Sequence, residues 1–128
     1  MGPLERLWIA LAAVLGAIAV LAGAFAAHAL SDPRAVELFR TGAQWAAVHV
    51  LACLLAVILG RLGLAVARIA APVFLAGTLL FSGSLYALAL GAPIWTAAFT
   101  PIGGLLFIAG WVILFVSAVS RSGPDLRA

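Results

Sequence analysis

The sequence predicts an all-α protein, namely a four-helix transmembrane bundle with a short interfacial helix between its first two spans. Of the 128 residues, 66% are hydrophobic and 9% are charged, whereas a soluble domain carries about 25% charged residues. Uncharged stretches alternate with charged clusters, and together they have room for four spans of about 20 apolar residues each. We therefore expect a single integral membrane domain over residues 1–128, with spans at residues 4–30, 41–59, 69–90 and 101–120.

The first span carries small residues at heptad spacing on one narrow face, which lets a neighbouring backbone approach closely. These residues are Ala12, Gly16, Ala19, Gly23 and Ala26. The apolar run of this span is longer than the roughly 7 to 15 residues that form the core of a signal peptide. We therefore expect a retained helix here and not a cleaved leader.

An amphipathic segment separates the first two spans. Asp32 followed by Pro33 is typical of a helix N-cap with proline in the first turn. Residues 33–40 place Val36 and Phe39 on one side of a short helix and charged residues on the other. This pattern predicts a separate helix that lies in the headgroup layer, after which the second span begins.

The third span is the helix against which the others are predicted to pack. Residues 72–91 hold no charge. At about 100° per residue, a hydroxyl stripe on this helix consists of Thr78, Ser82 and Tyr86. A neighbouring small-residue groove consists of Gly83, Ala87 and Gly91. Burial of apolar area does not drive helices together in lipid, so close backbone contact and inter-helix hydrogen bonds do so.

The fourth span is predicted to begin with Thr100 as its N-cap and Pro101 in its first turn. The helix contains Gly103, Gly104 and Gly110, which carry no side chain, and Trp111 lies near its middle. Across the chain, the glycines predicted to serve helix packing are Gly16, Gly23, Gly77, Gly83, Gly91, Gly103, Gly104 and Gly110.

The distribution of arginine predicts the orientation in the membrane. With four spans, one side holds Arg6, Arg61, Arg68, Arg121 and Arg127, and the other holds Arg34 and Arg40. The positive-inside rule then places both termini in the cytoplasm. Because the same arginines account for the net charge of +3, we expect the lipid bilayer and no nucleic acid as a partner.

Polar side chains of the spans gather in the outer half of the predicted bundle. This candidate polar layer consists of His28, Gln44, His49, Ser82, Ser84, Tyr86 and Thr100. Polar groups in hydrocarbon need partners, so we expect these side chains to face each other inside the bundle. They either fix the helix register or form a functional site, and His49 is the main functional candidate because it is an intramembrane imidazole.

No pattern in the sequence indicates a catalytic, cofactor-binding or metal-binding residue, and we expect no cofactor. Ligation of haem would need two imidazoles at one depth, whereas the helical rise places His28 and His49 at depths that differ by several ångström. Ser84 has no acidic residue nearby, and no nucleophile elbow is present. The single cysteine, Cys53, excludes an internal disulfide.

Four segments resemble a known family. They are GAFAAHAL (residues 23–30), TGAQWAAVHVLA (residues 41–52), FSGSLYALAL (residues 81–90) and TPIGGLLFIAGW (residues 100–111). In this order they are similar to domain of unknown function family four-two-three, whose members are small four-helix bacterial membrane proteins with transmembrane relatives in eukaryotes. The chain departs from the family pattern at Ala26, where Gly is common, and at Trp45 and Ala46, where Tyr and Gln are common. The resemblance implies an integral inner-membrane protein and no particular reaction.

Three functional hypotheses follow. The leading one is a non-enzymatic accessory or scaffold component that packs through small-residue helix faces, as a homo-oligomer or in a larger membrane complex. The first alternative is an oligomeric pathway for a small solute or protons through His49, Gln44 and Tyr86. The second alternative is a haem or metal redox carrier.

Overall fold

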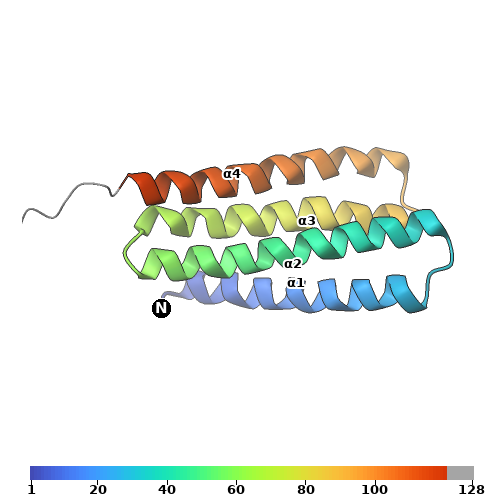
Figure 1. The fold of residues 1–128 in the computed structure, drawn as a ribbon, viewed down its shortest axis with the longest axis horizontal. Helices are drawn as coiled ribbons and strands as arrows, with labels where there is room; N and C mark the ends of the chain where they lie inside the picture. Colours follow the sequence, from blue (N-terminus) through green and yellow to red (C-terminus); the bar gives the residue numbers. More distant parts are fainter. Residues whose placement is uncertain (121–128) are drawn as a thin grey trace, which may run out of the picture.

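The computed structural model describes residues 1–120, and these residues form four long helices joined by short connections. All four helices are long and apolar enough to cross a membrane, and no strand occurs in this part of the chain. They run alternately up and down, so the start of the first helix and the end of the last lie at the same end (Figure 1). The helices are α1 (Pro3–His28), α2 (Pro33–Arg61), α3 (Ala70–Ala89) and α4 (Phe99–Val119), with the short 3₁₀ helices η1 (Ala65–Ile69) before α3 and η2 (Ile94–Ala98) before α4.

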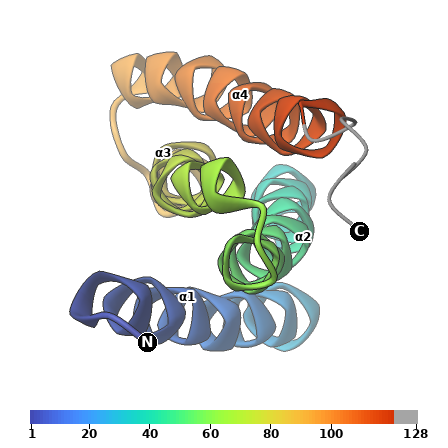
Figure 2. The same cartoon turned by 90° about the vertical axis from the view of Figure 1, so that its left-hand side faces the viewer.

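The four-helix transmembrane bundle predicted from the sequence is confirmed, and its helices form layers. Helices α2 and α3 lie side by side in the middle, α1 packs against α2, and α4 packs against α3 (Figure 2). Helix α1 makes far fewer contacts with α3 than with α2. Because the outer helices each lean on one central helix, grooves remain between α1 and α3 and between α2 and α4. Of the arginines used for orientation, Arg121 and Arg127 lie outside the described residues.

The predicted separate interfacial helix at residues 33–40 is wrong, because α2 runs without a break from Pro33 to Arg61. The predicted cap is present, since the Asp32 carboxylate accepts a hydrogen bond from the Ala35 N–H at 3.0 Å. The reason for the continuity is that the buried face does not stop at residue 40. It continues at helical spacing through Ala35, Phe39, Gly42, Ala43 and Ala46, and no proline interrupts this stretch.

Glycines bring α3 and α4 into backbone contact. A Cβ atom at Gly103 would collide with the Phe81 backbone nitrogen and would lie 2.8 Å from the Gly77 carbonyl oxygen. A Cβ atom at Gly77 would lie 2.7 Å from the Phe107 ring, and one at Gly110 would collide with the Phe74 ring. The neighbouring helix therefore occupies the space that a side chain would need at these three glycines.

The other glycines in the predicted packing set have different surroundings. Gly16 and Gly104 have room for a Cβ atom at ordinary contact distance. Gly23 and Gly83 have no atom within 4 Å of that position. Gly91 lies in the turn after α3 with φ +93°, a conformation that side-chain-bearing residues rarely adopt. Its observed role is therefore to turn the chain and not to pack helices.

The neighbouring residues Gly103 and Gly104 allow a matched test of this packing. We expect Gly103→Ala to lower the free energy of unfolding by about 1–3 kcal/mol, because the added methyl overpacks the α3–α4 contact. We expect Gly104→Ala to leave the stability unchanged or to raise it by up to about 1 kcal/mol, the gain typical of alanine over glycine in a helix. Denaturation in mild detergent, followed by circular dichroism, measures both. Equal effects of the two variants would contradict the backbone contact.

Candidate functional site

His49 lies at the centre of a cluster of aromatic rings. Its residue is 1% exposed, and its ring stacks on Phe107 with 3.5 Å between ring centroids and 7° between planes. Trp45 stacks against it from one turn earlier on α2, Phe74 approaches from α3, and Trp111 meets it edge-on from α4. Three helices therefore enclose one imidazole.

Hydrogen bonds engage both ring nitrogens of His49. Nδ1 lies 2.8 Å from the Trp45 carbonyl oxygen, and Trp111 Nε1 donates to His49 Nε2 at 3.2 Å. A carbonyl only accepts and an indole N–H only donates, so this network assigns the proton to Nδ1 in a neutral imidazole. A second donor or a metal ion reaches Nε2 only if the Trp111 indole moves away.

A groove of about 570 Å³ opens beside His49 between α2 and α4, with Phe81 of α3 contributing to it. Two half-exposed indoles, Trp45 and Trp111, line it together with Gly104. The walls are mainly apolar, so the groove suits a hydrocarbon or an aromatic ring. Its single basic atom, His49 Nε2, is covered by the Trp111 N–H.

The hydroxyl groups of α3 form separate local hydrogen bonds. Ser82 Oγ donates to the Gly42 carbonyl at 2.7 Å and so links α3 to α2. Ser84 Oγ lies 2.6 Å from Thr100 Oγ1 and so links α3 to α4. Thr78 donates to the Phe74 carbonyl of its own helix at 2.9 Å. The Ser82 and Ser84 bonds fix the position of α3 between its neighbours, and the three bonds do not join into a continuous chain.

Thr100 is not the N-cap predicted from the sequence. Helix α4 begins at Phe99 with Ala98 as its cap residue. The reason is that the 3₁₀ helix η2 runs directly into α4, so the helical backbone is already established when the chain reaches Thr100. The Thr100 hydroxyl is used between helices instead.

Tyr86 lies apart from the His49 cluster, on the side of α3 that faces α1. Its ring stacks on Phe39 with 5.1 Å between centroids and covers Gly42, where a Cβ atom would lie 2.6 Å from the ring. The Tyr86 hydroxyl is buried and has no hydrogen-bond partner among the described residues. The Tyr86 side chain lines the groove between α1 and α3.

The expectation that every polar side chain turns inward is wrong for His28 and Gln44, which are both exposed. His28 follows Ala26, which belongs to the buried face of α1, by two residues and therefore points away from that face. Gln44 comes between the buried Ala43 and Ala46 in the sequence, but it lies on the exposed face of α2. The structure therefore does not bring the two imidazoles together, and the functional role of the candidate polar layer stays a prediction.

The sequence did not predict Trp111 as the partner of His49. A signal was present, because an indole N–H in the middle of an apolar helix needs an acceptor. The two residues are 62 positions apart, so spacing could not pair them. Within the described residues, no group of three or more His, Cys, Asp or Glu side chains is placed to hold a metal ion.

The Trp111–His49 bond can be tested by a double-mutant cycle. We expect Trp111→Phe to lower the free energy of unfolding by about 0.5–2 kcal/mol, the range for inter-helix hydrogen bonds in membranes. In a His49→Phe background the same change should cost less, because the acceptor is already gone. Trp95→Phe, at an exposed position, is the control and should change stability by less than about 0.5 kcal/mol. An equal cost in both backgrounds would argue against the bond.

Comparison with known proteins supports the family resemblance. The family model described as "Protein of unknown function (DUF423)" matches residues 22–104. The UPF0382 inner membrane protein YgdD of Escherichia coli (strain K12) is 45% identical over 127 residues, which cover 90% of this chain and 91% of that protein. A UPF0382 membrane protein of Haemophilus influenzae is 39% identical and covers 87% of this chain and 92% of its own.

The similarity extends beyond these two species. The UPF0382 membrane protein YwdK of Bacillus subtilis is 34% identical, with 89% of this chain and 97% of that protein covered. No solved structure matches the chain. The family model spans more than half of the sequence and the relatives match nearly all of it, so this four-helix membrane protein belongs to the family of proteins of unknown function DUF423.

Proposed function

We propose that this chain is a non-enzymatic accessory or scaffold component of the bacterial inner membrane, which packs against a second copy of itself through the groove between α1 and α3. This groove, the Gly83 groove, has a volume of about 180 Å³. It is lined by Leu15, Ile18, Ala46, Thr78, Leu79, Ser82, Gly83 and Tyr86. The inner membrane location is supported by relatives such as the UPF0382 inner membrane protein YgdD.

The observation that carries the proposal is the environment of Gly83. This glycine is exposed and has no atom within 4 Å of its Cβ position. At Gly77 on the same helix, by contrast, the Phe107 ring occupies the space that a Cβ atom would need. Helices associate in lipid where small residues let backbones approach, so Gly83 offers such a contact to another helix. The Tyr86 side chain lines the same groove, so a helix seated there would pack against its ring.

The state of the buried polar groups supports a role without catalysis. Both nitrogens of His49 are engaged in hydrogen bonds. The hydroxyls of Ser82 and Ser84 are bonded to neighbouring helices. A nucleophile needs a base within hydrogen-bond reach, and none of these contacts provides such a pair.

The orientation that we propose places both termini in the cytoplasm. Arg6 lies near the start of α1, Arg61 is the last residue of α2, and Arg68 belongs to η1. The start of α1 and the connection from α2 to α3 lie at the same end of the bundle (Figure 1). Arg34 and Arg40 belong to the opposite end, where Asp32 and Glu37 offset them. This asymmetry in arginine supports the cytoplasmic assignment of the first end.

Cysteine labelling tests the orientation. Leu62, after α2, and Ile94, after α3, are both 75% exposed and lie in connections at opposite ends of the bundle. In a Cys53→Ala background, a membrane-impermeant maleimide added to intact spheroplasts should label Ile94→Cys and leave Leu62→Cys unlabelled until the cells are lysed. The reverse pattern would contradict the proposed orientation.

Cross-linking tests the scaffold proposal. In the Cys53→Ala background, we expect Gly83→Cys to form a disulfide-linked dimer in the native membrane under mild oxidation, because the two copies would meet at this position. Phe115→Cys, exposed on α4, is the matched control and should remain monomeric. A Gly83→Cys protein that stays monomeric, together with a monomeric mass in nanodiscs and no co-purifying protein, would reject the proposal. Cross-linking of Gly83→Cys to a different protein would reject self-association.

A further inference from the structure

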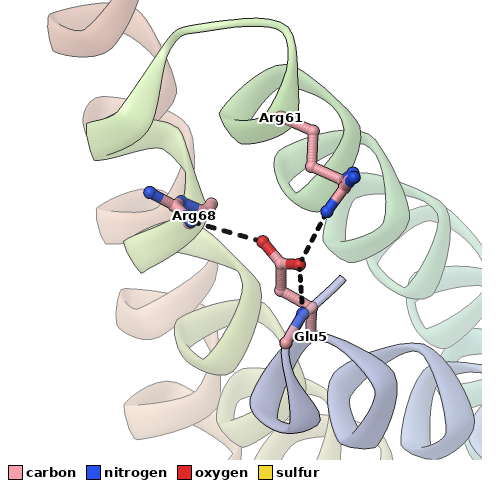
Figure 3. A network of polar contacts seen from close by, with 4 residues as sticks. Glu5, Arg61 and Arg68 are labelled. Atoms are coloured by element: carbon pink, nitrogen blue, oxygen red, sulfur yellow. Dashed lines mark hydrogen bonds and ion pairs between the residues drawn. The ribbon is translucent and has the colours of Figure 1, made fainter.

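Three charged side chains from three segments meet at the end of the bundle where α1 begins. The Glu5 carboxylate of α1 accepts from Arg61 at the end of α2 at 3.2 Å and from Arg68 of η1 at 3.4 Å (Figure 3). It also accepts from the Gly2 backbone N–H at 3.1 Å. The contacts join residues 56 and 63 positions apart, and no sequence pattern predicted them.

This cluster carries an excess of positive charge. The Glu5 side chain is 8% exposed, whereas those of Arg61 and Arg68 are 48% and 45% exposed. One carboxylate neutralises only one of the two guanidinium groups. Each guanidinium has five N–H donors, and a single nitrogen of each contacts Glu5. Further donors of both arginines therefore remain for a second anion.

A hollow of about 610 Å³ lies against the same two arginines. Leu4 and Trp8 of α1 form its apolar side, and Gly60 of α2 contributes to the opposite side. The Arg68 side chain occupies the space that a side chain at position 60 would need, with its Cδ atom 2.7 Å from the Cβ position. The glycine thus lets Arg68 lie across the end of α2, beside Arg61.

The position of the hollow determines which anion fits it. Trp8 is an aromatic residue near a helix end, where tryptophan is enriched at the membrane boundary. Leu4 and Leu7, on the exposed surface of α1, continue from the hollow toward the hydrocarbon. Guanidinium pairs bind phosphate oxygens in a bidentate manner, and basic pockets between transmembrane helices bind anionic lipid headgroups. A phosphate diester carries one negative charge, which matches the uncompensated positive charge.

We propose that Arg61 and Arg68, held together by Glu5, bind the phosphate group of an anionic phospholipid whose acyl chains lie along α1. A network with only a structural role would need no hollow and would gain little from arginines that are about half exposed. The proposal is independent of the scaffold function, because it uses the opposite end of the bundle from Tyr86 and does not require a second copy.

Binding of phosphatidylglycerol to the full-length protein in mild detergent tests the proposal, with native mass spectrometry to count bound lipids. We expect phosphatidylglycerol to bind more tightly than phosphatidylcholine. The Arg61→Gln/Arg68→Gln double variant should bind phosphatidylglycerol about 25-fold more weakly. This is about fivefold for each arginine lost at a membrane surface. The matched control is Arg34→Gln/Arg40→Gln, which removes the same charge at the opposite end and should change the affinity by less than about twofold.

Several outcomes would overturn the assignment. One is an equal loss of phosphatidylglycerol affinity in the two double variants. Another is equal binding of phosphatidylglycerol and phosphatidylcholine. A third is binding of free inorganic phosphate at the arginines in place of the lipid. If the glutamine pair does not fold, the Arg61→Lys/Arg68→Lys pair provides the readout, because it keeps both charges near Glu5 but loses the planar guanidinium fork. We expect it to bind phosphatidylglycerol more weakly than the unaltered protein. Unchanged affinity in this pair would also overturn the proposal.

Discussion

Close contact between helix backbones is the constraint on which this structure depends. Lipid is as apolar as the side chains, so the helices gain little by burying leucine against leucine, and they gain from van der Waals contact and inter-helix hydrogen bonds instead. Gly77 and Gly103 bring α3 and α4 together until backbone atoms meet. Alanine permits the same close approach along α1, where it forms most of the buried face, and it is the commonest buried residue of α2. The core is therefore narrow, and few large side chains are enclosed in it.

The enclosed polar groups follow from the same constraint. Hydrocarbon offers no water, so a buried donor needs an acceptor within the protein. Ser82 of α3 donates to the Gly42 carbonyl of α2, and Trp111 of α4 donates to His49 of α2. These bonds are separate pairs that link neighbouring helices. The Tyr86 hydroxyl is the buried side-chain atom without such a partner among the described residues, and the Tyr86 side chain lines the groove between α1 and α3.

The layered arrangement explains why distinct surfaces exist on so small a protein. Because α1 leans on α2 and α4 leans on α3 (Figure 2), one groove contains Gly83 and Tyr86 and the other contains His49 and its aromatic rings. At one end, Glu5 ties α1 to the connection between α2 and α3 through two arginines. The Arg61 pair reinforces the packing of α1 on α2, whereas the Arg68 pair joins α1 to η1, which otherwise make little contact.

The sequence by itself determined the number of spans, their apolar character, the Asp32 cap and the family, because these depend on composition and local spacing. It predicted a helix end near residue 40 that is absent, because the buried face of α2 extends past that position. It also placed His28 and Gln44 in the interior, since helical periodicity defines a face but not what covers it. Only the tertiary structure paired Trp111 with His49 and both arginines with Glu5. Those pairings depend on how each helix is rotated and on which neighbour it packs against. Local sequence spacing does not determine either, because the paired residues are far apart in the chain.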